Sequence, residues 1–254
     1  MRYFDSLTHP TAGGAWLSSK QDSSISNLLG KMDSAGMDMA CLVGIEGVTS
    51  NDEILTFAMN HPDRFVPIAG FNPIKSSNIA NDIADIKNQG FVGIKLHPRF
   101  NNYNPLDPRC IEAINIAGEL GIVSFICTLF RQKQIRTCHT ADIIDAIATT
   151  CKNSTIVLVH GGGTAMLDIF ELVRMHPHLI LDLAFSMLRY EGSSLDLDMR
   201  FVCKHLDQRV IFGSDFPESM PAEAISRIEE LTHDLSDKKR ENILSKNLER
   251  LFQK

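Results

Sequence analysis

Polar residues that could do chemistry follow apolar runs at several points of the chain. Asp215 comes just after the apolar residues 210–212, and His160 directly follows another such run. His9 and His97 stand in the same position after two earlier runs. Imidazoles and a carboxylate from different strands are ligand types that zinc uses. The same groups could act without metal, with Asp215 as general base and a histidine, His160 or His97, polarising the substrate.

Cationic side chains flank these candidate catalytic residues. Lys95 and Arg99 lie two residues before and after His97, and Arg131 follows the fifth apolar run. Guanidinium groups at the rim of a pocket are suited to carboxylates. We therefore expect Lys95, Arg99 and Arg131 to bind the substrate, and we expect that substrate to be a small anionic molecule.

Cys127 ends the fifth apolar run and allows two interpretations. As a thiolate it could ligate a soft metal, which favours zinc over magnesium or manganese. As a buried thiol without a cationic neighbour it would be inert packing. The sequence leaves both open.

Eight apolar segments alternate with helical patterns and would position these residues. Because the segments are nearly continuous apolar runs, they indicate a parallel sheet covered by helices on both sides. Strict alternation over 254 residues favours a (β/α)8 TIM barrel, with an open doubly wound sheet as the alternative. Such barrels carry their chemistry at the C-terminal ends of the strands. The expected strands are residues 2–7, 39–45, 65–71, 91–96, 122–127, 155–159, 179–185 and a segment beginning at 210.

The intervening helices carry recognisable end signals. Asn51 and Asp52 are expected to cap a helix that ends at His61, and Asp107 with Pro108 begins another. A polar helix over roughly residues 237–252 closes the barrel. With no linker visible, we expect a single domain over residues 1–254.

Composition excludes several classes of protein. The formal net charge is −6, and no basic run is present that could follow a nucleic-acid backbone. No apolar segment approaches the roughly 18 residues that span a bilayer. The first residues lack the apolar core of a signal peptide. Six widely spaced cysteines favour free thiols in a reducing compartment, so we expect a cytoplasmic protein.

Four segments in order resemble the amidohydrolase superfamily, specifically its amidohydrolase-related group of metal-dependent hydrolases. That group includes enzymes similar to pyrone-dicarboxylate lactonase and aminocarboxymuconate-semialdehyde decarboxylase. The resemblance lies in GFVGIKLHP at residues 90–98, TIVLVHGGG at 155–163, VIFGSDFP at 210–217 and NILSKNLERLF at 242–252. It implies a barrel enzyme whose metal ligands would be His9, His160, Asp215 and Cys127.

Two positions depart from the family pattern. Leu7 stands where the first histidine of an HxH pair is expected, and Cys127 stands where the fifth strand supplies a histidine ligand. Leucine cannot coordinate a metal, so the implied metal site is degenerate.

Three functional states remain open. In one, a single zinc ion is held by His9, His160 and Asp215, with or without Cys127, and a bound water attacks a carbonyl. In the second, no metal binds, Asp215 activates water, and His160, His97 or Lys95 stabilises the oxyanion. In the third, the barrel only binds a small acid.

We expect a hydrolase acting on a carboxylated lactone or amide. A zinc-dependent decarboxylase of the same family is an alternative, as is the small-acid-binding barrel without catalysis. A homodimer is the candidate assembly.

Overall fold

The computed structural model describes residues 1–17, 19–130 and 139–253. Eight parallel strands lie side by side in the order in which they occur in the chain. They are β1 (Phe4–Thr8), β2 (Met39–Val43), β3 (Phe65–Phe71), β4 (Gly93–Leu96), β5 (Val123–Cys127), β6 (Ile156–Val159), β7 (Leu179–Asp182) and β8 (Val210–Ile211).

Hydrogen bonds between the two edges of the sheet join β8 and the residues after it to β1. The Ser6 amide donates to the Phe212 carbonyl at 3.0 Å, and the Asp215 amide donates to the Leu7 carbonyl at 2.9 Å. The His9 amide donates to the Phe216 carbonyl at 2.8 Å. The predicted (β/α)8 barrel is therefore confirmed, and its closure places His9 beside Asp215.

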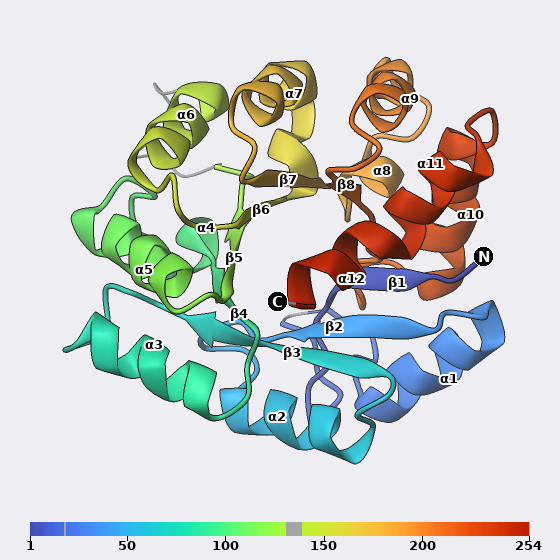
Figure 1. The fold of residues 1–254 in the computed structure, drawn as a ribbon. Helices are drawn as coiled ribbons and strands as arrows, with labels where there is room; N and C mark the ends of the chain where they lie inside the picture. Colours follow the sequence, from blue (N-terminus) through green and yellow to red (C-terminus); the bar gives the residue numbers. More distant parts are fainter. Residues whose placement is uncertain (18, 131–138, 254) are drawn as a thin grey trace.

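Most of the helices form a ring outside the strands (Figure 1). Their bounds are α1 (Ile25–Ala35), α2 (Asn51–Asn60), α3 (Ile79–Asn88), α4 (Pro98–Asn101), α5 (Pro108–Glu119), α6 (Thr140–Thr150), α7 (Met166–Met175), α8 (Ser186–Arg189), α9 (Leu195–His205), α10 (Pro221–Thr232), α11 (Asp237–Glu241) and α12 (Asn247–Phe252). A 3₁₀ segment, η2 (His160–Ala165), follows β6, and a π segment, η3 (Asn242–Lys246), joins α11 to α12. In the described part of the chain no helix is long and apolar enough to cross a membrane.

Two apolar cores follow from this arrangement. The larger lies between the strands and the helices, and the smaller fills the inside of the barrel with residues such as Leu7, Val43 and Phe125. Leu248 of α12 belongs to the inner core, and the Phe252 ring lies 6.2 Å from that of Phe4. Figure 1 shows α12 across one end of the barrel, beside β1. The opposite end is left for the site.

Three of the predicted boundaries were wrong. The helix expected to be capped by Asn51 and Asp52 begins with Ser50, whose side chain accepts from the Glu53 amide at 3.2 Å while Glu53 bonds back in a capping box. That helix ends at Asn60 rather than at His61. The seventh strand ends at Asp182 instead of continuing to 185, because the Asp182 carboxylate accepts the amide of Ala184 and turns the chain.

The closing helix was predicted as one continuous element and is instead divided by η3. The Asn247 side chain donates to the carbonyls of Val210, at 2.6 Å, and Asp207, at 2.7 Å. These bonds fix the C-terminal segment against the start of β8. The predicted Asp107 cap is confirmed by its bond from the Arg109 amide.

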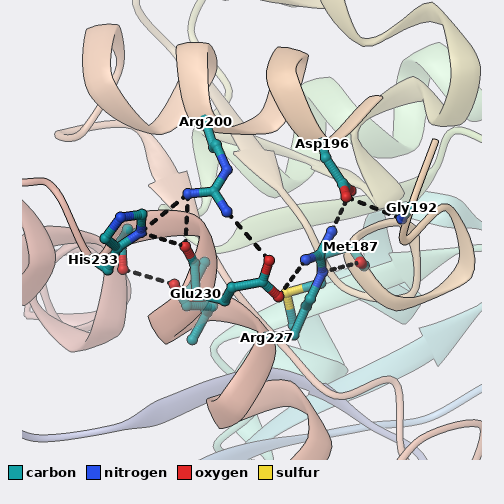
Figure 2. A network of polar contacts seen from close by, with 9 residues as sticks. Met187, Gly192, Asp196, Arg200, Arg227, Glu230 and His233 are labelled. Atoms are coloured by element: carbon teal, nitrogen blue, oxygen red, sulfur yellow. Dashed lines mark hydrogen bonds and ion pairs between the residues drawn. The ribbon is translucent and has the colours of Figure 1, made fainter. Parts of the chain in front are cut away.

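A buried arginine ties the outer helices near β7 and β8 together. Arg227 of α10 is 3% exposed. It donates to the Met187 carbonyl at 2.9 Å, to Glu230 at 2.6 Å and to Asp196 of α9 (Figure 2). Its guanidinium therefore has a partner at each of its three nitrogens.

Candidate active site

Strained backbone marks the C-terminal ends of three neighbouring strands. His160, Phe185 and Asp215 follow β6, β7 and β8 with φ angles of 71°, 63° and 58°. Non-glycine residues with positive φ are uncommon and cost free energy, and they cluster at functional sites. His160 is followed by Gly161, Gly162 and Gly163, all of which also have positive φ. The backbone is thus held in a costly shape where the side chains converge.

The converging side chains line a cavity of about 380 Å³ at this end of the barrel. This volume suits a small molecule. Six of the residues predicted from sequence line it: His9, Lys95, His97, Arg99, His160 and Asp215. Arg131 lies outside the described residues. Cys127 lies buried and is not part of the cavity wall.

His9 and Asp215 form a pair across the junction of β1 and β8. His9 Nε2 lies 3.4 Å from Asp215 Oδ1. His9 Nδ1 donates to the Val43 carbonyl at 2.7 Å, which directs Nε2 toward the carboxylate. Burial raises the pKa of Asp215, but His160 and His9 outweigh it and bring the pKa below its usual value. Asp215 is therefore an ionised carboxylate at neutral pH.

Trp16 and Glu218 support this pair and were not predicted from sequence. The Trp16 ring stacks on His9 with 5.5 Å between centroids and 8° between planes. Trp16 Nε1 donates to Glu218 Oε1 at 2.6 Å, and the Glu218 amide donates to the Asp215 carbonyl at 2.8 Å. Both residues line the cavity. Two features of the sequence could have drawn attention to them. Glu218 follows Asp215 by three residues, and Trp16 is the only tryptophan of the chain.

Hydrogen bonds to residues at the end of β7 hold His160 in place. Its Nδ1 donates to the Ala184 carbonyl at 3.0 Å, and its amide donates to Asp182 Oδ2 at 3.3 Å. With Nδ1 occupied, Nε2 is the nitrogen available for other partners. Burial lowers the pKa of His160, but Asp215 and Cys127 outweigh it and leave the pKa raised.

His97 has the opposite electrostatic character. Its Nδ1 accepts the Phe100 amide at 3.2 Å, so the ring carries its proton on Nε2 when neutral. Burial lowers the pKa of His97. His97 is therefore a neutral imidazole that can donate one hydrogen bond.

Cys127 lies beneath the cavity, between His97 and His160. Burial raises the pKa of its thiol, but the charges and hydrogen bonds of the two histidines outweigh burial and bring the pKa well below its usual value. The histidine neighbours of Cys127 come from other strands, so the sequence alone did not show them beside the thiol. Cys127 acts on the cavity through these two imidazoles.

Lys95 is buried at the end of β4 and is 1% exposed. Its Nζ has no hydrogen-bond partner among the described residues. Burial lowers the pKa of this amine. Arg99, four residues later, is exposed at the cavity rim. The two cationic groups thus stand at different depths of one cavity.

The donor atoms do not fit the metal that the family resemblance implies. Within residues 1–17, 19–130 and 139–253, no group of three or more His, Cys, Asp or Glu side chains is arranged to hold an ion. His9 and Asp215 contact each other, whereas Cys127 contacts His97 and His160. Leu7 is fully buried in the inner core at the position where a histidine ligand would be needed.

A polar layer lies beneath the cavity. Asp5 Oδ1 accepts the amides of Leu7 at 3.0 Å and Ser214 at 2.9 Å. Asp5 Oδ2 has no partner in the part of the chain that the structure describes. Burial raises the pKa of Asp5 to about 7. Ser6 Oγ donates to Asp182 at 2.7 Å and so links β1 to β7.

Solved structures share this fold at low sequence identity. A TIM-barrel protein from Bordetella bronchiseptica has 19% identity and a TM-score of 0.83, with 99% of this chain and 98% of that chain covered. A probable 2-pyrone-4,6-dicarboxylic acid hydrolase from Acinetobacter baumannii, with citric acid bound, has 15% identity and a TM-score of 0.72, with 99% of each chain covered.

A 5-carboxyvanillate decarboxylase from Sphingomonas paucimobilis has 15% identity and a TM-score of 0.72, covering 99% of this chain and 98% of that chain. A comparison with curated protein sequences finds no match. The sequence model of the family described as Amidohydrolase matches residues 16–254. From this match, and from a barrel with its polar groups at the strand ends, we conclude that the chain belongs to the amidohydrolase family.

Proposed function

We propose that this protein hydrolyses a small carboxylated lactone or amide without a bound metal ion. The observation that carries the proposal is the pairing of an ionised Asp215 with His9 in the cavity wall. The Lys95 amine, which has no hydrogen-bond partner among the described residues, lines the same cavity. A carboxylate can take a proton from water, and an N–H donor can stabilise the oxygen on which charge develops.

In this mechanism Asp215 accepts a proton while the water oxygen bonds to the substrate carbonyl carbon. The π electrons of the carbonyl move to its oxygen. Lys95 is the donor for that oxygen, because the side chains of His97 and His160 bond to Cys127. The tetrahedral intermediate then expels the ring alkoxide or the amine, which takes up the proton held at Asp215. A lactone would yield a hydroxy acid.

The anionic character of the substrate is supported by Arg99. Its guanidinium lies at the exposed rim, whereas the catalytic groups are buried. A carboxylate on Arg99 would orient the substrate with its carbonyl toward Lys95. The Acinetobacter neighbour with citric acid bound supports a small polycarboxylate as ligand, so citrate is a suitable non-reactive probe of binding here.

The test is hydrolysis of 2-pyrone-4,6-dicarboxylate by protein purified without added metal and assayed with a chelator. We expect hydrolysis to persist in the chelator and to fall by about 10²–10⁴-fold in Asp215→Asn, the usual contribution of a general base. Asp63→Asn is the matched control, because Asp63 is exposed and lies away from the cavity.

Each of the alternative functions predicts a different outcome of this test. Stoichiometric zinc with activity lost in chelator would favour the metal-dependent states, and release of CO2 from a carboxylated aromatic acid would favour the decarboxylase. Citrate binding with no turnover would identify an acid-binding barrel. Equal hydrolysis by wild type and Asp215→Asn would remove Asp215 from the mechanism.

A further inference from the structure

Lys95 combines burial, isolation and access to the cavity. It lines the cavity and is 1% exposed. Its Nζ has no hydrogen-bond partner among the residues that the structure describes. An ammonium group removed from water in this way is strongly disfavoured unless a partner compensates for its charge. In the proposed hydrolysis this amine acts only as an N–H donor.

Burial outweighs the charges of Cys127, Asp215 and Asp182 and lowers the pKa of Lys95, so its amine loses the proton more readily than an exposed lysine does. A neutral lysine amine is a nucleophile toward ketones and aldehydes, and desolvation in a pocket is one of the ways in which enzymes activate it. The geometry therefore provides more than a binding group. It provides a reactive amine at the wall of a cavity sized for a small molecule.

Groups that can move protons surround this amine. The neutral His97 and the protonatable His160 line the same cavity, as does Asp215. Formation of an imine needs such groups, because a proton must leave nitrogen and a hydroxyl must leave carbon. Arg99 at the rim provides an anchor for a carboxylate on the same molecule.

We propose that Lys95 forms an imine with a small oxo acid, a carboxylate that also carries a ketone or aldehyde group. The lysine nitrogen bonds to the carbonyl carbon, and the carbonyl oxygen takes a proton to give a carbinolamine. The oxygen then leaves as water with the two hydrogens that were on nitrogen. This inference rests on the cavity used for the proposed hydrolysis, but not on water attack by way of Asp215.

The imine would give the site a second activity. Once protonated, it accepts the electron pair of a breaking carbon–carbon bond. A 3-oxo acid would lose CO2, leaving an enamine that takes a proton at carbon. Water would then restore the lysine amine and release a ketone, so no metal or oxidant is needed.

The experiment is reductive trapping. Wild-type protein is mixed with acetoacetate or pyruvate, treated with sodium borohydride and analysed by intact mass and peptide mapping. With pyruvate we expect a mass increase equal to the oxo acid minus one oxygen atom, located at Lys95. With acetoacetate we expect the same kind of adduct, or that mass less CO2 where decarboxylation precedes trapping, also at Lys95. The probes 3-hydroxybutyrate and lactate, which lack the ketone, should leave the mass unchanged.

Two variants complete the design. Lys95→Met should lose the adduct, and Lys20→Met, which removes an exposed lysine, should retain it. Peptide mapping of the wild type locates the adduct even where Lys95→Met fails to fold. No adduct, or adducts only on other lysines, would overturn the inference.

Lactone hydrolysis measured on the same preparation separates the two proposals. An adduct without hydrolysis overturns only the hydrolytic function. Hydrolysis without an adduct overturns only the imine.

Discussion

Two buried basic side chains of this barrel have opposite surroundings. Arg227, 3% exposed among the outer helices, has partners at all three nitrogens (Figure 2). Lys95, 1% exposed at the cavity, has none within residues 1–17, 19–130 and 139–253. Both basic groups are removed from water. Among the described residues, only Arg227 has hydrogen-bond partners that compensate for the lost hydration.

The difference in partners indicates that Arg227 has a structural role and Lys95 a functional one. A buried polar group without a partner lowers stability, so a fold retains one where a ligand supplies the partner. Asp5 is intermediate. Its Oδ1 accepts two backbone amides, whereas its Oδ2 has no hydrogen-bond partner among the described residues. The comparison therefore predicts that substitutions at these positions will divide between effects on stability and effects on activity.

The largest effect on stability is expected at Arg227. Arg227→Met leaves Asp196, whose carboxylate is mostly buried, without its cation. Breaking a buried pair in this way costs about 3–5 kcal/mol of unfolding free energy. Denaturant titration would measure the loss, with Arg189→Met, an exposed arginine of α8, as control. If both variants lost the same amount, Arg227 would not be a special structural cation.

Asp5 predicts a dependence of stability on pH. Burial raises its folded pKa to about 7, above the ordinary value of 3.8 for an aspartate, so the folded state binds the proton more tightly. The favourable contribution is complete below pH 4 and is lost as pH rises through 7. Asp5→Asn should therefore raise the unfolding free energy at pH 8, by about 4 kcal/mol at 1.36 kcal/mol per pKa unit.

The measurement for Asp5 is urea unfolding at pH 5 and pH 8, with Asp63→Asn as the exposed control. The Asp5→Asn variant should gain more stability at pH 8 than at pH 5, because pH 5 lies only about one unit above the pKa of the unfolded carboxyl group. An equal gain at both pH values would mean that Asp5 does not titrate in this range.

The smallest effect is expected beside His9. Glu218→Met removes the acceptor of the Trp16 indole N–H, which should cost about 1 kcal/mol of unfolding free energy. Glu218→Gln retains an acceptor oxygen and should cost less. Because Trp16 is the only tryptophan, its fluorescence reports the change directly. Identical emission from all three proteins would contradict the contact.

The barrel and its catalytic end were predictable because apolar runs end abruptly in polar residues. Each run is long enough for one strand, and parallel strands deliver their C-terminal residues to one place. His9, His160 and Asp215 could thus be placed on one cavity from sequence, and their separation in the chain did not matter.

Other features depended on contacts that a linear pattern does not contain. The end of β7 is set by bonds of the Asp182 side chain, and Ser50 rather than Asn51 caps α2 although both residue types favour that position. The histidines beside Cys127 come from other strands. The isolation of Lys95 could be recognised only once its surroundings were known.

The most direct test of the account measures stability and turnover on Lys95→Met. We predict that the unfolding free energy stays equal to wild type or rises, because an unpaired amine is replaced by an apolar chain of similar size. Turnover of the lactone should fall by about 10²–10³-fold, the usual effect of removing a donor to an oxyanion. A loss of stability like that at Arg227, with turnover intact, would contradict the claim that Lys95 is kept unpaired for a ligand.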